Sequence, residues 1–159
     1  MDELLEEYLE KNRVNCILHR HEAVFTVAES SKNEEIRNIP GLDCKTLFLK
    51  DDKGRVYLVG LPAHKRLDIK KLEKHLEVKK LKFGSAEELK EKTNLAPGSV
   101  SIFGAVYSAQ VMLIIEKEVW DAEIVGFHPN VNTETLEIRH DDLERYYNSL
   151  NNRKEILEL

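Results

Sequence analysis

Two apolar runs, KTLFLKD (45–51) and RVYLVGL (55–61), flank the short polar segment DKG, which ends in Gly54. Apolar runs of this length, separated by a glycine-containing turn, predict a β-hairpin. Similar runs predict further strands at residues 14–19, 79–83, 111–117, 122–127 and 134–139, and the tail KEILEL can pair as an edge strand. A chain with so many strands is expected to be built around a sheet.

Between these strands, apolar residues recur at the 3.6-residue spacing of amphipathic helices. Thr26–Glu29 and Ser85–Glu88 have capping-box spacing, which marks two helix starts. The expected helices are residues 2–12, 27–37, 67–76, 85–92 and 141–150, the last capped by Asp141 or Asp142. Residues 96–106 contain the turn signal Pro97–Gly98 and are expected to be irregular.

Single helices are interspersed with adjacent strands, without the regular βαβ repeat of a doubly wound sheet. The order predicts an α+β fold in which helices surround a mixed β-sheet. No linker or internal repeat is visible, so residues 1–159 are expected to form a single domain. With 42% apolar residues, a chain of this length can bury a core.

Cys16 and Cys44 are the only cysteines and do not form a CxxC pair. Two isolated thiols favour a reducing, cytoplasmic setting over a disulfide framework or a zinc site. No apolar run approaches the 18 residues of a membrane span, and the acidic start MDELLEEYLE differs from a signal peptide. We expect a cytoplasmic monomer without membrane contact.

Charge is unevenly distributed along the chain. Residues 65–82 contain eight basic and three acidic residues, so this segment carries +5 while the remainder carries −10. Such a segment can bind phosphates, although a solvated helix face is the plainer interpretation. Its candidate phosphate-binding residues are Lys65, Arg66, Lys70, Lys71 and Lys74.

Common nucleotide-binding, zinc-protease and hydrolase motifs are absent. His19 and His21 could begin a metal site because alternate strand residues face the same side, but a third ligand at useful spacing is missing. Exposed strand-end histidines are the plainer interpretation, and no metal or cofactor is expected.

Three local signals could instead build a site. Lys45 opens an apolar strand and could clamp a phosphate or carboxylate. Backbone N–H groups of the turn Gly98–Ser101 could converge on a carbonyl oxygen. His128, extended because Pro129 follows it, could orient water or a ribose hydroxyl together with the amide of Asn130. The alternatives are a strand-end lysine, a connector and an Asn-rich turn.

Taken together and in order, KTLFLKDDKGRVYLVGLP, KRLDIKKLEKHL, LKFGSAEELKEKTNLAPGSVSIFGAV and EIVGFHPNVNTETLEI resemble the YbaK/prolyl-tRNA synthetase-associated family. The resemblance spans about residues 18–150. Within this family, the sequence is most similar to the trans-editing branch that deacylates alanyl-tRNA(Pro) and includes proteins labelled PrdX. The resemblance implies a metal-independent hydrolase acting on the ester between a wrong amino acid and its tRNA.

Site roles follow from this resemblance by matching positions. Lys45 would contact the phosphate side of the terminal adenosine, the Gly98 loop would position the aminoacyl ester, and His128 would lie at the rim. Further substrate contacts are expected from Thr46, Ser99, Asn130, Val24, Phe25 and Val27, the last three as the wall that admits alanine and refuses proline. The basic segment would contact the acceptor stem of the tRNA.

Two positions depart from the family pattern. The loop motif GxxxP has Ile102 in place of proline, which would otherwise fix φ and stiffen the loop. Thr46 stands where an amide side chain is frequent. A non-catalytic tRNA-binding protein and an editor of another small amino acid, serine or cysteine, therefore remain alternatives. Docking on prolyl-tRNA synthetase is left open.

Overall fold

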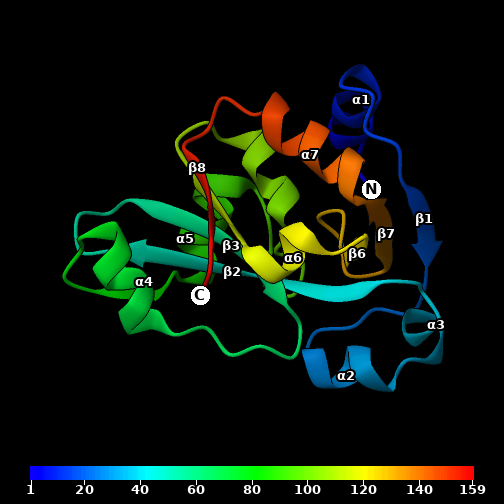
Figure 1. Cartoon of the computed structure of the whole chain (residues 1–159), viewed down its shortest axis with the longest axis horizontal. Helices are drawn as coiled ribbons and strands as arrows, with labels where there is room; N and C mark the ends of the chain where they lie inside the picture. Colours follow the sequence, from blue (N-terminus) through cyan, green and yellow to red (C-terminus); the bar gives the residue numbers. More distant parts are fainter.

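The computed structural model describes residues 1–159, whose strands form one eight-stranded mixed sheet with helices around it (Figure 1). The strands are β1 (Ile17–Arg20), β2 (Leu42–Asp51), β3 (Val56–Pro62), β4 (Leu81–Phe83), β5 (Met112–Glu116), β6 (Ile124–Phe127), β7 (Glu134–Arg139) and β8 (Lys154–Leu157). The helices are α1 (Glu3–Lys11), α2 (Val27–Lys32), α3 (Glu34–Arg37), α4 (Ile69–Leu76), α5 (Ala86–Thr93), α6 (Lys117–Asp121), α7 (His140–Ser149) and the 3₁₀ helix η1 (Ile102–Tyr107).

Strand β2 connects the two halves of the sheet, whose order is β1-β7-β6-β2-β3-β5-β8. Its first residues, Leu42 and Asp43, pair in parallel with β6, and the rest of the strand pairs with β3 in the expected hairpin. The distal end of β2 also pairs with β4. The sheet is therefore continuous only through β2, and residues at its start lie where β6 and β3 diverge.

Two apolar clusters cover opposite faces of this sheet. Alternate residues of β3 belong to different clusters: Leu58 packs toward α1, η1 and α7, whereas Val59 and Leu61 pack toward α4. Figure 1 shows α1 and α7 together above the sheet, α4 at its left end, and α2 and α3 below the right-hand half of β2. None of the helices combines the length and apolar character needed to cross a bilayer.

The helix predicted for residues 27–37 is wrong as a single element. It divides into α2 and α3 because Asn33 takes an extended ψ of 116° and its side chain accepts a hydrogen bond from the backbone of Ile36, which starts a new helix. The last helix has no side-chain cap, so the cap expected from Asp141 or Asp142 is also wrong; both lie in its first turn. The edge strand expected in the tail is confirmed as β8, parallel to β5.

Candidate functional site

A pocket of about 220 Å³ opens at the start of β2. Five segments that are far apart in the sequence form its wall: residues 24–27 with Ser30, the first half of β2, Ala63 after β3, the loop at Gly98 and Val100, and the end of β6 with His128. The pocket thus brings together Lys45, Gly98 and His128, the residues of the three local signals. It also includes Thr46 and the segment Val24–Val27.

Lys45 contributes the pocket's only ammonium group. It pairs in register with Leu61 of β3, and its half-buried side chain has no carboxylate within ion-pair distance. Lys50 on the same strand differs, because it forms an ion pair with Glu88. Partial burial lowers the pKa of Lys45. Lys45 is therefore a cation held by a central strand and free to bind an anionic group.

His128 is held in one tautomer. Its Nδ1 lies 2.8 Å from the carbonyl oxygen of Glu134, which can only accept, so Nδ1 carries the hydrogen and Nε2 carries the lone pair in the neutral ring. Burial lowers the pKa of His128, which favours this neutral form. The ring of His21 lies next to it, with ring centroids 5.9 Å apart. His128 thus offers an acceptor nitrogen, not a cation.

The loop at Gly98 depends on a conformation that suits glycine. Its φ is +86°, and a Cβ at this position would lie 3.2 Å from Cδ1 of Phe25. Phe25 itself is 64% exposed, although it lines the pocket. Val24 is buried and Val27 is exposed, so this wall is buried at Val24 and open at Phe25 and Val27.

Ile102, the departure from the loop proline, is fully buried at the start of η1. Ser101 caps this helix by accepting a hydrogen bond from the backbone of Phe103, and Tyr146 donates its hydroxyl to the carbonyl oxygen of Ile102 at 2.7 Å. The side chain of Ile102 packs so closely on Gly60 that a Cβ there would lie 2.8 Å from it. Core contacts therefore fix the end of this loop without proline.

Two predicted substrate-binding residues lie outside the pocket wall, namely Ser99 and Asn130. Asn130 is buried with φ +65°, and neither atom of its amide has a hydrogen-bond partner. Its loop has a clear structural role, since the carbonyl groups of Asn132 and Thr133 accept hydrogen bonds from the backbones of Val24 and His21. The segment after His128 thus anchors the strand that leads into the pocket wall.

Sequence reasoning missed three polar residues of the pocket, Thr26, Ser30 and Asp43. Asp43 precedes Lys45 by two positions, so strand alternation places both on the same face. This spacing was the available signal, but nothing in the sequence indicated that the strand begins before Lys45. Burial raises the pKa of the Asp43 carboxyl, partly offset by His128 and by the hydroxyl of Ser30.

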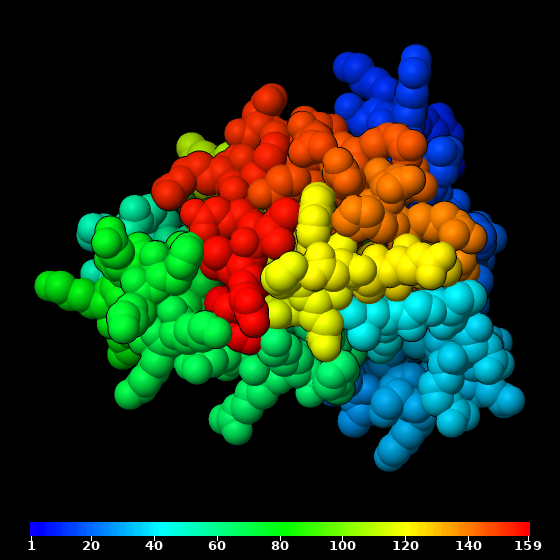
Figure 2. Space-filling view, viewed as in Figure 1, coloured from blue at the N-terminus to red at the C-terminus, as the bar shows by residue number.

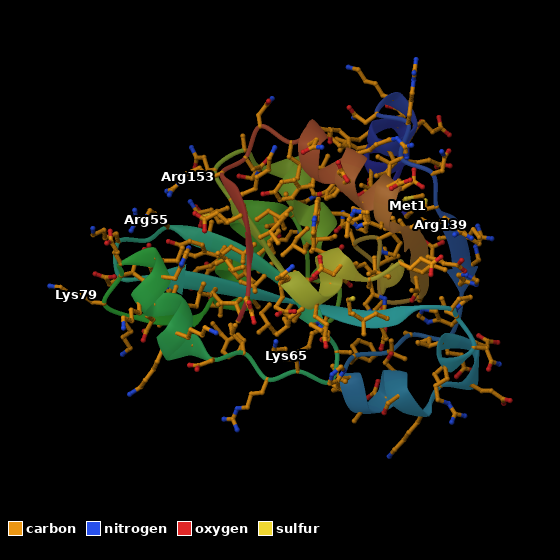
Figure 3. The ribbon with its side chains drawn as sticks, viewed as in Figure 1. Met1, Arg55, Lys65, Lys79, Arg139 and Arg153 are labelled. Carbon is orange, nitrogen blue, oxygen red and sulfur yellow. The ribbon has the colours of Figure 1, made fainter.

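The predicted basic segment begins next to the pocket, because Ala63 lines it and Lys65 follows two residues later. Figure 3 labels Lys65 below the middle of the sheet and Lys79 at the left edge of the molecule. Lys65 forms an ion pair with the buried Glu116 at 3.0 Å, so its charge is already balanced. Arg66, Lys70, Lys71 and Lys74 are exposed and have no ion-pair partner.

The two histidines considered as metal ligands are engaged elsewhere. His19 lies 2.9 Å from the carboxylate of Glu137, and His21 bonds to Thr135 and to the carbonyl of Glu22. No group of three or more histidine, cysteine, aspartate or glutamate side chains is arranged to hold a metal ion.

The molecular surface in Figure 2 shows α4 and the C-terminal strand side by side on one face.

Comparison with known proteins connects this geometry to a family. Residues 21–146 match the aminoacyl-tRNA editing domain. The prolyl-tRNA editing protein ProX of Acetoanaerobium sticklandii is 32% identical over 154 residues, which cover 95% of this chain and 93% of the relative. The prolyl-tRNA synthetase associated domain-containing protein 1 of Danio rerio is 28% identical over 146 residues, covering 89% and 78%.

Solved structures show the same fold. The hypothetical protein APE2540 superimposes with a TM-score of 0.79 at 21% identity, with 98% of each chain covered. A proposed trans-editing enzyme for prolyl-tRNA synthetase superimposes with a TM-score of 0.77 at 17% identity, covering all of this chain and 98% of the other. The α+β fold expected from the sequence is confirmed. By its sequence match over residues 21–146 and its similarity to ProX, the chain belongs to the aminoacyl-tRNA editing domain family.

Proposed function

We propose that this chain is a single-domain aminoacyl-tRNA deacylase that acts in trans on mischarged tRNA, with Ala-tRNA(Pro) as its main substrate. The observation that carries the proposal is the single pocket in which an unpaired Lys45, the Gly98 loop and a neutral His128 meet. Family membership and the similarity to ProX support the reaction class. Mischarged tRNA released by prolyl-tRNA synthetase is the proposed source of substrate.

Hydrolysis of an aminoacyl ester needs positioning more than a strong nucleophile, because the ester is already activated. The ammonium of Lys45 binds a phosphate of the terminal nucleotide. Nε2 of His128 accepts a hydrogen bond from the attacking water and holds it in place. As the water oxygen bonds to the carbonyl carbon, the water transfers this proton to Nε2.

Backbone N–H groups of the Gly98 loop stabilise the negative charge that forms on the carbonyl oxygen. The tetrahedral intermediate then collapses. The bond between the carbonyl carbon and the ribose oxygen breaks, and the ribose oxygen takes the proton back from His128. The products are a free amino acid and a tRNA with an intact 3′ end. No residue of the chain becomes covalently linked to the substrate in this scheme.

Selection against proline is assigned to the wall formed by Val24 and Val27. A synthetase pocket shaped for proline cannot strongly exclude a smaller side chain, because each missing methylene is worth only about 1–3 kcal/mol. A second pocket that is too small for the proline ring corrects this error by size. Arg66, Lys70, Lys71 and Lys74 then hold the acceptor stem through its phosphates.

The test is deacylation of a panel of tRNA(Pro) charged with alanine, serine, cysteine or proline. Wild type is expected to release alanine fastest and to leave Pro-tRNA(Pro) intact. Lys45→Ala is expected to lose activity by about ten- to a hundredfold, the worth of one charge-assisted hydrogen bond. The control is Lys53→Ala, which removes an exposed lysine from the β2–β3 turn and should leave the rate unchanged.

Each alternative gives a distinct result in this panel. Faster release of serine or cysteine than of alanine would assign the enzyme to another small amino acid. Salt-sensitive tRNA binding without release of any amino acid would identify a binding protein and overturn the deacylase proposal.

A further inference from the structure

The pocket contains one carboxylate, Asp43, in addition to its one ammonium, Lys45. Both belong to β2 and are separated by one residue, so their side chains leave the same face of the strand about 6–7 Å apart. Lys45 has no ion-pair partner, and neither does Asp43. Two side chains of opposite charge thus leave fixed backbone positions toward the same cavity, each available to a ligand.

The backbone of Asp43 is held from both sides. It pairs with Gly126 of β6, and its carbonyl oxygen accepts a hydrogen bond from the backbone of Ala63 at 2.9 Å. The hydroxyl of Ser30 approaches Oδ2 of the carboxylate at 3.5 Å. The backbone of Asp43 is therefore fixed, while its exposed carboxylate remains open to a ligand.

The substrate of the proposed reaction has a matching pair of charges. An aminoacyl-tRNA end carries phosphate on the nucleotide and a positive α-ammonium group next to the ester carbonyl. A free α-amino group has a pKa of about 7.7–8.0, so this group is mostly protonated at pH 7. When the aminoacyl-tRNA end lies between these two side chains, its phosphate is near Lys45 and its α-ammonium group is near Asp43.

We infer that Asp43 binds the α-ammonium group of the aminoacyl ester and makes the pocket select charged aminoacyl groups over neutral acyl groups of the same size. This inference rests on the deacylase proposed above and adds a specificity-determining residue to it. Val24 and Val27 select the side chain by size, whereas Asp43 recognises the α-ammonium group of the aminoacyl ester. The pocket thereby rejects acyl esters that lack the ammonium.

The experiment compares alanyl-tRNA(Pro) with lactyl-tRNA(Pro), in which a hydroxyl replaces the ammonium at nearly constant size. Because the ammonium also makes the alanyl ester more reactive in water, each kcat/KM is divided by the rate of the same ester in buffer. Wild type is expected to prefer the alanyl ester about ten- to a hundredfold after this correction, the range of a charge-assisted hydrogen bond.

The variant Asp43→Asn keeps the shape and removes the charge, so the corrected preference should fall to about one, mainly through the alanyl ester. Asp141→Asn is the matched control, because it removes an exposed carboxylate from the first turn of α7, outside the pocket, and should keep the wild-type preference.

A wild type that hydrolyses both esters with equal corrected kcat/KM would overturn the role of Asp43 and leave the deacylase standing. An unchanged preference in Asp43→Asn would do the same. Should this variant not fold, the wild-type comparison alone decides between these outcomes. A wild type that hydrolyses neither ester would overturn the deacylase proposal itself.

Discussion

Tyr146 of α7 donates its hydroxyl hydrogen to the carbonyl oxygen of Ile102, with the two oxygens 2.7 Å apart. Both side chains are fully buried, and burial raises the pKa of Tyr146 well above its usual value, so the hydroxyl stays protonated. Because Ile102 ends the loop that begins at Gly98, this bond ties one wall of the pocket to a helix on the far side of the core.

Tyr146→Phe removes this hydrogen bond and little else. We expect the free energy of unfolding to fall by about 1–3 kcal/mol, the cost of a buried donor lost to its acceptor. The deacylation rate should fall as well, because the Gly98 loop loses an anchor. Chemical denaturation and deacylation assays on the same preparation measure both effects. A variant as stable as wild type would show that the bond contributes nothing to the loop.

The hairpin of β2 and β3 was predictable from sequence because two apolar runs meet at a short turn containing Gly54. The break at Asn33 was not, since a capping side chain competes with helix continuation and the outcome depends on the packing of the buried Ile36. The 3₁₀ helix after Ser101 also escaped prediction: its apolar residues, including Ile102, are held by contacts from β3 and α7.

Acid inactivation should begin below the usual histidine range if neutral His128 accepts a hydrogen bond from water. Burial lowers its pKa below the ordinary 6.5, so the ring stays neutral as pH falls through 6.5 and is protonated only at lower pH. We expect kcat to hold through pH 6.5 and then decline with acid. His128→Ala should be slower by about a hundredfold, within the usual range for general base catalysis, and should lack this decline.

The lowered pKa of His128 also makes the stability of the folded protein depend on pH. The unfolded chain binds a proton at His128 near pH 6.5 while the folded chain does not, so its contribution to stability is lost as pH falls below that value. The stability of wild type should therefore drop relative to His128→Ala in this range. Urea titrations of the two proteins at pH 7 and pH 5.5 provide the measurement, and an unchanged difference would contradict the shift.

Thr46 lines the pocket, and its buried hydroxyl has no hydrogen-bond partner. If this hydroxyl is reserved for substrate, Thr46→Val should slow deacylation by about tenfold while leaving stability equal or raising it by up to about 1 kcal/mol, because an unsatisfied buried group is removed. Thermal melts and kcat/KM on Ala-tRNA(Pro) separate the two effects. Full activity in this variant would exclude Thr46 from substrate binding.

Salt should weaken substrate binding, because the residues of the basic segment that have no ion-pair partner are proposed to bind tRNA phosphates. Each lysine that contacts a phosphate adds roughly one to the slope of log K against log salt. Replacing Lys70, Lys71 and Lys74 with glutamine should lower the slope of log KM against log salt by about three. The value of kcat should not change. A variant with Lys11 and Lys90 replaced, on other helices, is the control. Equal slopes in all three proteins would place the tRNA elsewhere.

The candidate site was only partly predictable, for reasons that differ between residues. Lys45, Gly98 and His128 have distinctive local patterns, and the structure brings them together. Asn130 carries an equally distinctive pattern, but it lies outside the pocket wall. Asp43 had no such pattern, since its importance depends on β6 pairing with the start of β2, a long-range contact.

Lys45 and Asp43 lie on β2, the strand that alone connects the two halves of the sheet. This position determines when their backbone amides become accessible to solvent. Separating the halves breaks the pairing at the start of β2, so the amide hydrogens of Asp43 and Lys45 should exchange with solvent only when the whole molecule unfolds. The active surface would then disappear in the same cooperative event as the fold, without a partially unfolded state that still hydrolyses substrate.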